Sequence, residues 1–183
     1  MIYKLLISCL LIVSINNTYA QNKPETITNL NQVIEDFRTS IINHNNIEKF
    51  SSLFLHDSIT WASINIGETK KIVSEKNPDF RIYSSDYTSF YNFLKSRDSE
   101  LEEKFYNVQI SVRNEFATIS FDYSFNVDDQ VNNWGLEYWS LILINNRWLI
   151  TSVTWTTNLQ RYEKCPFKLK NQFVFNNNTS NKK

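Results

Sequence analysis

The chain has 183 residues, and its 19 Lys and Arg residues balance 19 Asp and Glu residues, so the formal net charge at pH 7 is zero. No cluster of Lys or Arg forms the basic surface that nucleic acid requires, which argues against a nucleic-acid-binding protein. Only two glycines are present, so a glycine-rich phosphate-binding loop is excluded as well.

The first 20 residues have the features of a secretory signal peptide. Lys4 precedes an apolar run from Leu5 to Ile15, and Thr18 and Ala20 provide small residues for a cleavage site. The run is shorter than the roughly 20 apolar residues of a membrane-spanning helix, so we expect no membrane span. Cleavage after Ala20 predicts a secreted or periplasmic protein. Cys9 lies inside the apolar run, which disfavours the alternative of a lipoprotein.

Without this segment, Cys165 is the only cysteine of the chain. We therefore expect no internal disulfide and a domain that depends on packing for its stability. A chain of this length can bury one core without such bridges. Because no histidine lies beside Cys165 in the sequence, it is not predicted to be a nucleophile.

Three helices are predicted in the N-terminal half. Apolar residues recur at helical spacing from Ile27 to Ile41, and the asparagines at 43–46 suit a helix end followed by a new N-cap. A shorter helix then carries its apolar residues between Ile47 and Phe54. The third begins near Ser85 or Asp86 and directs Phe90, Phe93 and Leu94 inward.

Between the second and third helices, the alternation of residues 57–66 predicts a β-strand. Residues 67–85 are polar and rich in lysine, with Pro78 in the middle. We predict a long loop there, with a short strand near Phe80 to Tyr83.

Four longer strands follow as two hairpins. The first joins Phe105–Val112 to Phe116–Val127 at Asn114–Glu115. Its alternation predicts one apolar and one polar face. The apolar face comprises Tyr106, Val108, Ile110, Val112, Ala117, Ile119, Phe121, Tyr123 and Phe125, and Asp122 falls on the polar face.

The second hairpin spans residues 134–157 and turns at Asn145–Asn146. A regular register pairs Trp139 with Ser152 and Glu137 with Thr154. One face then carries Glu137, Trp139, Leu141, Leu143, Trp148, Ile150, Ser152 and Thr154, and the other carries Trp134, Tyr138, Val153 and Trp155. Neither is a plain solvent face, so we expect helices to cover one and a partner chain to cover the other.

This order predicts an α+β domain in which three N-terminal helices pack on a strongly curved antiparallel sheet. The domain covers residues 26–158, and residues 159–183 form a C-terminal extension that is partly disordered.

Four segments carry a resemblance to a known family, and they are Asn43–Phe54, Asp57–Trp61, Trp134–Glu137 and Arg147–Val153. With them the chain resembles the NTF2-like superfamily, the cystatin-like α+β cone that includes SnoaL-like and DUF4440-type proteins. The resemblance spans residues 26–157. It implies a pocket and often a dimer, but no particular chemistry, because members of this superfamily include isomerases, dehydratases, cyclases, ligand carriers and partner-binding modules.

Enzymes of that superfamily often place a proton-transferring pair inside the cone. Glu137 is the best ionisable candidate, because its face also carries Trp139, Trp148 and Ile150, and burial there would raise its pKa. Tyr123 or Tyr106 would serve as the hydrogen-bond donor. His44 and His56 are expected at the surface and lack metal-ligand spacing, so no metal site or cofactor is predicted.

Three functions remain open. The first is binding of a small hydrophobic ligand, with a pocket lined by Trp61, Ser63, Tyr106, Trp139, Ser152 and Thr154. The second is a homodimer or partner-binding module that acts through the sheet face, with an exposed Trp134, Tyr138 and Trp155 patch as its signature. The third is a cofactor-independent isomerase, dehydratase or cyclase with Glu137 as its acid or base and Tyr123 beside it.

Overall fold

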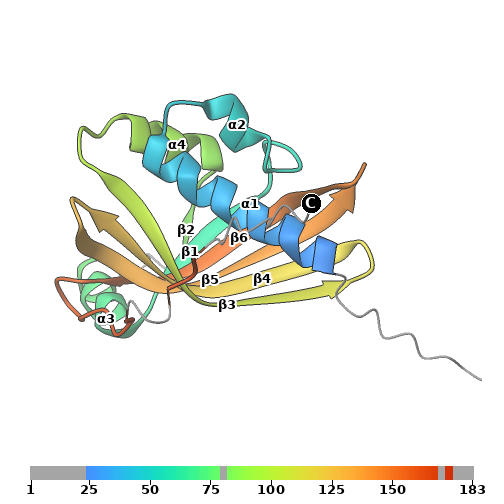
Figure 1. The fold of residues 1–183 in the computed structure, drawn as a ribbon. Helices are drawn as coiled ribbons and strands as arrows, with labels where there is room; N and C mark the ends of the chain where they lie inside the picture. The colour runs from blue at the N-terminus through green and yellow to red at the C-terminus, as the bar shows by residue number, and fades with distance from the viewer. Residues whose placement is uncertain (1–23, 79–81, 169–171, 175–183) are drawn as a thin grey trace, which may run out of the picture.

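The computed structural model describes residues 24–78, 82–168 and 172–174 (Figure 1). The predicted signal peptide and part of the predicted strand near Phe80 therefore lie outside the described residues. The helices are α1 (Pro24–Asn43), α2 (Ile47–Ser51), α3 (Gly67–Lys76) and α4 (Tyr87–Lys95). The strands are β1 (Thr60–Asn65), β2 (Tyr83–Ser84), β3 (Leu101–Arg113), β4 (Phe116–Val127), β5 (Gln130–Ile144) and β6 (Arg147–Leu159).

The six strands form one sheet in the order β2-β1-β6-β5-β4-β3. The long strands pair as antiparallel neighbours, as predicted. The prediction of a wholly antiparallel sheet is wrong at one pair, because β1 runs parallel to β6. A parallel pair needs a long crossover connection rather than a hairpin, and here the chain between the two strands supplies it.

Helices α1, α2 and α4 lie over one face of the curved sheet, whereas α3 lies apart from them at one end of it (Figure 1). The predicted N-cap is confirmed at α2, and α4 begins at the predicted position with a cap of its own. The Asn46 side chain accepts a hydrogen bond from Lys49 N at 2.8 Å, and Asp86 accepts one from Ser89 N at 2.7 Å. Each satisfies one of the backbone N–H groups that a helix N-terminus leaves without a helical partner.

The prediction of a loop at residues 67–85 is wrong over its first half, which forms α3. This helix has little apolar surface, so its period is weak in the sequence. Contacts with the sheet hold it in place. Thr69 is fully buried, and its hydroxyl accepts a hydrogen bond from Leu159 N at the end of β6. Tertiary contact has overridden a weak local signal here.

Aromatic rings fill the space between the helices and one half of the sheet. Phe37 of α1 lies 5.4 Å from Phe50, 6.4 Å from Phe105 and 4.6 Å from Trp139, measured between ring centroids. Phe37, Phe50, Phe105 and Trp139 are all almost fully buried. Tilted and edge-on pairs at these distances add to the free energy of simple area burial.

A β-bulge in β3 changes which residues face the helices. The pairing of β3 with β4 shifts between Tyr106 and Gln109, and Asn107 takes a positive φ of 53°. An extra residue at a bulge reverses the alternation beyond it. Tyr106 therefore lies on the outer face, the one away from α1, where its hydroxyl lies 3.1 Å from Ser124 Oγ. Its predicted place on the inner face is wrong.

A second bulge in β6 has the same effect. The Asn145–Asn146 turn and the first pairs of the hairpin follow the predicted register, up to Leu141 with Ile150. The register then shifts by one residue, so that Trp139 pairs with Val153 and Glu137 with Trp155. Residues beyond the bulge therefore exchange faces. The predicted inner positions of Ser152 and Thr154 are wrong, as are the predicted outer positions of Val153 and Trp155.

The outer face is partly covered by the chain's own C-terminal segment. Trp134 donates a hydrogen bond from Nε1 to Glu163 O at 2.9 Å, and Phe167 packs against both Trp134 and Tyr106. Trp134 is consequently only 8% exposed, whereas Tyr138 is 51% exposed. The predicted exposed patch of Trp134, Tyr138 and Trp155 does not form, because only Tyr138 faces solvent there.

Candidate functional site

A cavity of about 600 Å³ opens between α4 and the end of the sheet where β3 begins and β6 ends. This volume suits a small organic molecule, since ligand pockets measure roughly 300–1,000 Å³. Most of its wall is apolar. The aromatic part of that wall consists of Trp61, Tyr83, Phe90, Phe93, Phe125 and Trp155.

Glu137 lies on the cavity wall and is only 4% exposed. Trp139, two residues along the same face of β5, donates a hydrogen bond from Nε1 to Glu137 Oε1 at 2.5 Å. Burial raises the pKa of Glu137 to about 7, even though hydrogen bonds from Trp139 and Glu103 act in the opposite direction. Burial is the predicted cause, since a carboxylate loses its hydration there.

The partner of Glu137 is a second buried carboxyl group, Glu103 of β3. It is 5% exposed, lines the same cavity and is hydrogen bonded to Glu137. Burial raises the pKa of Glu103 well above its ordinary value, and the charge of Glu137 raises it further. Two carboxyl groups in contact cannot both ionise at low cost, so the pair shares a proton near neutral pH.

Tyr123 of β4 lines the cavity beside this pair. Its hydroxyl lies 3.0 Å from Thr156 O and 3.1 Å from Asn133 Oδ1, so its proton is donated within the sheet. Burial raises the pKa of Tyr123, and the charges of Glu103 and Glu137 raise it further.

Gly135 faces Tyr123 across the β4–β5 pair and leaves room for this contact. A Cβ at residue 135 would lie 2.0 Å from Thr156 O, so no larger residue fits without a shift of the backbone.

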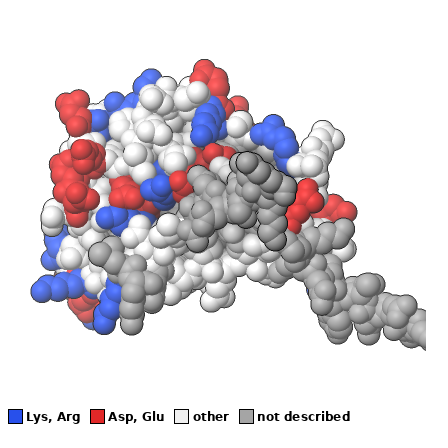
Figure 2. All heavy atoms as spheres, in the orientation of Figure 1, with Lys and Arg blue, Asp and Glu red and all other residues white. Residues whose placement is uncertain are grey.

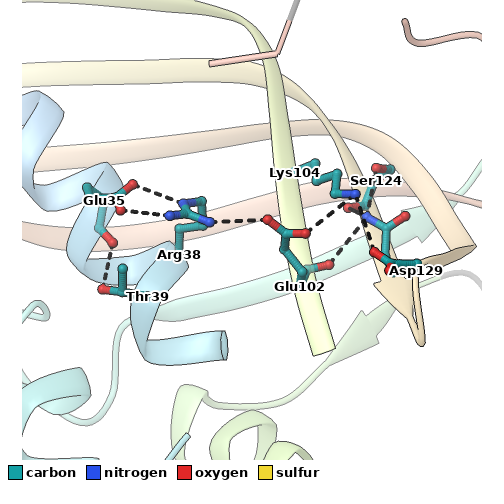
Figure 3. A network of polar contacts seen from close by, with 8 residues as sticks. Glu35, Arg38, Thr39, Glu102, Lys104, Ser124 and Asp129 are labelled. Carbon is teal, nitrogen blue, oxygen red and sulfur yellow. Dashed lines mark hydrogen bonds and ion pairs between the residues drawn. The ribbon is translucent and has the colours of Figure 1, made fainter. Parts of the chain in front are cut away.

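An ion-pair network on the other side of β3 ties this strand to α1 (Figure 3). Arg38 binds both carboxylate oxygens of Glu35, at 2.9 and 2.8 Å, and contacts Glu102 Oε1 at 3.1 Å. Lys104 continues the network from Glu102 Oε2, at 3.5 Å, to Asp129, at 3.9 Å. Glu102 is the neighbour of Glu103, so the network fixes the strand segment that carries the buried carboxyl group.

No family model matches the sequence, and no curated protein matches it. Solved structures do match. An NTF2-like family protein from Streptomyces avermitilis gives a TM-score of 0.54 at 13% identity over 74% of this chain and 99% of that chain. An NTF2-like protein from Cytophaga hutchinsonii gives 0.51 at 13% identity over 75% and 100%. One of unknown function from Silicibacter pomeroyi gives 0.52 at 13% identity over 73% and 97%. The chain has the NTF2-like fold.

At this level of identity the likeness shows the fold and no activity, and the SnoaL-like or DUF4440-type subdivision stays a prediction. Within the NTF2-like fold, the structure brings four predicted residues to the region of the cavity. Glu137, Tyr123, Trp61 and Ser63 line it. Trp139 lies behind its wall and contacts the cavity through Glu137.

Three predicted ligand-binding residues lie elsewhere, on the outer face of the NTF2-like sheet. They are Tyr106, Ser152 and Thr154, and each is displaced by one of the two bulges. Val153, Trp155 and Thr157 line the cavity in place of Ser152 and Thr154.

Glu103 and Trp155 are the residues that sequence reasoning missed. Both bulges can be seen in the sequence. At each one, two successive inward-facing apolar residues are three positions apart, whereas elsewhere in the strand they are two positions apart. The gap falls between Phe105 and Val108 in β3 and between Ile150 and Val153 in β6. A change of alternation at these gaps would have placed Glu103 and Trp155 on the inner face.

In the part of the chain that the structure describes, the other titratable groups give no second centre. His44 directly follows α1 and its Nδ1 lies 3.0 Å from Ile41 O, and His56 is exposed. Burial raises the pKa of the Cys165 thiol, which disfavours the reactive thiolate. Within the described residues, no three His, Cys, Asp or Glu side chains are placed to hold a metal ion. None of the described helices is both long and apolar enough to span a membrane.

Charged side chains are mixed on the surface of the NTF2-like domain. On the face seen in Figure 2, Lys and Arg lie among Asp and Glu instead of gathering in one basic patch. Such a distribution gives no electrostatic footprint for nucleic acid on the described part of this face.

Proposed function

We propose that this chain binds a small, largely apolar organic molecule in the cavity beneath α4. The observation that carries the proposal is the buried Glu103–Glu137 pair, which faces a cavity of about 600 Å³ with an aromatic wall. Apolar walls with a few placed polar groups are the usual composition of small-molecule sites. The rings provide contact area, and the carboxyl groups orient one polar group of the ligand.

A variant whose cavity is filled by a larger side chain tests this proposal. Nile red, a neutral apolar dye, is expected to bind the protein and to gain fluorescence. Ser63→Phe fills the cavity and should abolish that gain. Thr154→Phe places the same ring on the outer face, one strand away, and should leave it unchanged. Equal binding by the two variants, with both shown to be folded by circular dichroism, would refute the cavity as the site.

Acid–base catalysis is a second candidate, favoured by the pKa of about 7 at Glu137. A carboxyl group that titrates near neutral pH can both accept and donate a proton, as an isomerase, dehydratase or cyclase requires. Tyr123 would take part only if its hydroxyl turned away from Thr156. Glu137→Gln should then remove turnover in any such reaction and leave substrate binding within about threefold. Retained turnover would exclude Glu137 as the acid or base.

Self-association through the outer face is a third candidate. Ile64 is 45% exposed and Tyr138 is 51% exposed on that face, close to the parallel β1–β6 pair. Sedimentation velocity at several concentrations would detect a dimer, and Tyr138→Lys should dissociate it. A concentration-independent monomer would exclude this interface.

We also propose that the protein is secreted or periplasmic. The support is the sequence of residues 1–20 alone. The intact mass of the protein from its own host should correspond to a chain that begins at Gln21. A mass that still includes residues 1–20 would refute cleavage.

A further inference from the structure

We propose that the molecule bound in this cavity carries a protonated amine, whose N–H groups are held by Glu103 and Glu137 while its apolar part lies against the aromatic wall. This inference rests on the proposed function, because it names the ligand class of the same site.

The first observation is that two buried carboxyl groups have no protein cation beside them. Glu103 and Glu137 are each at least 95% buried, and among the described residues no ion pair joins either of them to Lys, Arg or His. Ionisation of a buried carboxyl group is costly unless a cation is present. In the free protein a shared proton limits this cost. A ligand ammonium group would replace that proton and supply N–H donors to both carboxylates.

The second observation is the shape of the aromatic wall. Trp61 lies 5.6 Å from Trp155 and 5.5 Å from Phe90, and Tyr83 lies 6.4 Å from Trp155, measured between ring centroids. Rings from β1, β2, β6 and α4 therefore line one cavity together. Aromatic faces attract organic cations, and the combination of such rings with carboxylates is a recognised environment for ammonium groups.

Arg97 is the one cation among the residues that line the cavity, and it lies at the mouth. Its side chain is exposed, and its Cζ lies 4.7 Å from the centroid of the Phe93 ring. Arg97 also lines a neighbouring surface pocket whose wall includes Asp98 and Glu100. Solvent screens an exposed charge, so Arg97 does not neutralise the buried pair. It would favour a ligand whose outer end is neutral or anionic.

The proposal fixes the sign of a pH dependence. The titratable groups that face the site are Glu103 of β3, Glu137 of β5, Tyr123 of β4, Tyr83 of β2 and Arg97 before β3, and the residues of α1, β1 and β6 on the wall do not titrate. An amine needs the ionised carboxylates, so its binding releases protons and its affinity should rise between pH 6 and pH 8. A neutral ligand accepts a hydrogen bond from the protonated pair, so its affinity should fall over that range.

Two probes of the same shape test the proposal. They are 2-naphthylmethylamine and 2-naphthalenemethanol, titrated calorimetrically into the purified protein at pH 6 and pH 8. We expect the amine to bind at least about tenfold more tightly than the alcohol at pH 8, with a gain in affinity from pH 6. An alcohol that binds as tightly as the amine, or an amine affinity that falls with pH, would overturn the inference.

Variants separate the buried pair from general electrostatics. Glu103→Gln and Glu137→Gln should each weaken amine binding at least about tenfold and change alcohol binding by less than about threefold. Glu100→Gln removes an exposed carboxylate three residues before Glu103, and should leave amine binding unchanged. Equal losses in all three variants would contradict direct contact.

The outcomes also distinguish this inference from the function on which it rests. Binding of the alcohol but not of the amine would overturn the amine inference and retain the cavity as a ligand site. Failure of both probes, together with Nile red binding that Ser63→Phe does not affect, would overturn both.

Discussion

The two ends of the helix-covered sheet face differ in what occupies them. At the closed end Phe50, Phe105 and Trp139 pack against the ring of Phe37, which also lines the cavity. At the other end, rings of the same kind surround a cavity with two carboxyl groups in its wall. Aromatic composition alone therefore does not distinguish core from pocket. The distinguishing feature is the pair of buried polar residues, because a closed core would exclude them.

The largest expected effect is at the closed end. Phe50 is fully buried against Phe37, Phe54 and Tyr91, so Phe50→Ala should lower the free energy of unfolding by about 3–5 kcal/mol. Trp155→Ala at the open end removes a larger side chain that is only half-buried and borders a void. This substitution should lower the free energy of unfolding by about half as much or less, and should abolish ligand binding. Urea unfolding measures both, and equal costs would contradict the division into two ends.

Gly135 lies at the open end, on β5 between the cavity-lining residues Asn133 and Glu137. Gly135→Ala should destabilise the protein by about 1–3 kcal/mol, because the new Cβ would meet a backbone oxygen of β6 that cannot move alone. Loss of the Tyr123 contact to Thr156 should accompany it. The absorbance of the tyrosines, followed during an alkaline titration, would report a change at Tyr123. Wild-type stability in the alanine variant would show that the strands separate at little cost.

The carboxyl pair should make the open end sensitive to pH. A carboxyl whose pKa is raised by folding keeps its proton in the folded state and releases it in the unfolded state. Its contribution is therefore fully present below about pH 4.5 and is lost as pH rises toward about 7, the pKa of Glu137. Relative to Glu137→Gln, the wild-type protein should lose about 1–3 kcal/mol between pH 4.5 and pH 8.

Urea unfolding of the wild-type protein and of Glu137→Gln across this pH range measures the difference directly. The glutamine keeps an oxygen that can accept from Trp139 Nε1, so the comparison isolates the ionisation. Parallel stability curves for the two proteins would contradict an ionisable pair in the cavity.

The same division separates what the sequence predicts well from what it does not. The packed half is set by local patterns, including the apolar period of α1, the Asn46 cap and the Asn145–Asn146 turn, and these predictions are confirmed. The α+β class and the sheet of long antiparallel strands follow from the same patterns. The regular register fails where a single extra residue reverses the alternation of β3 and of β6, and the cavity-lining residues Glu103, Val153 and Trp155 lie beyond those two places.

The candidate site depends on contacts between distant strands. Glu103 and Glu137 meet only because β3 and β5 flank β4, and no local pattern encodes their hydrogen bond. Glu137 could be proposed from its apolar neighbours alone. Glu103 could not, because it lies in a run of charged residues, Glu100 and Glu102–Lys104, that favours an exposed segment. Its burial follows from the strand that begins at Leu101, four residues before the predicted start.

The smallest expected effect tests whether the outer network of β3 contributes to the site. Arg38 is half-buried between Glu35 and Glu102, so Arg38→Ala should cost only about 0.5–1 kcal/mol of stability. Even a small movement of β3 would affect the site, because β3 carries Glu103 and its movement would separate Glu103 from Glu137. The pKa of Glu137, followed through the Trp139 indole signal by NMR, should therefore rise in this variant, because the hydrogen bond from Glu103 that lowers it is weakened. An unchanged pKa alongside reduced stability would mean that the packed half alone positions Glu103.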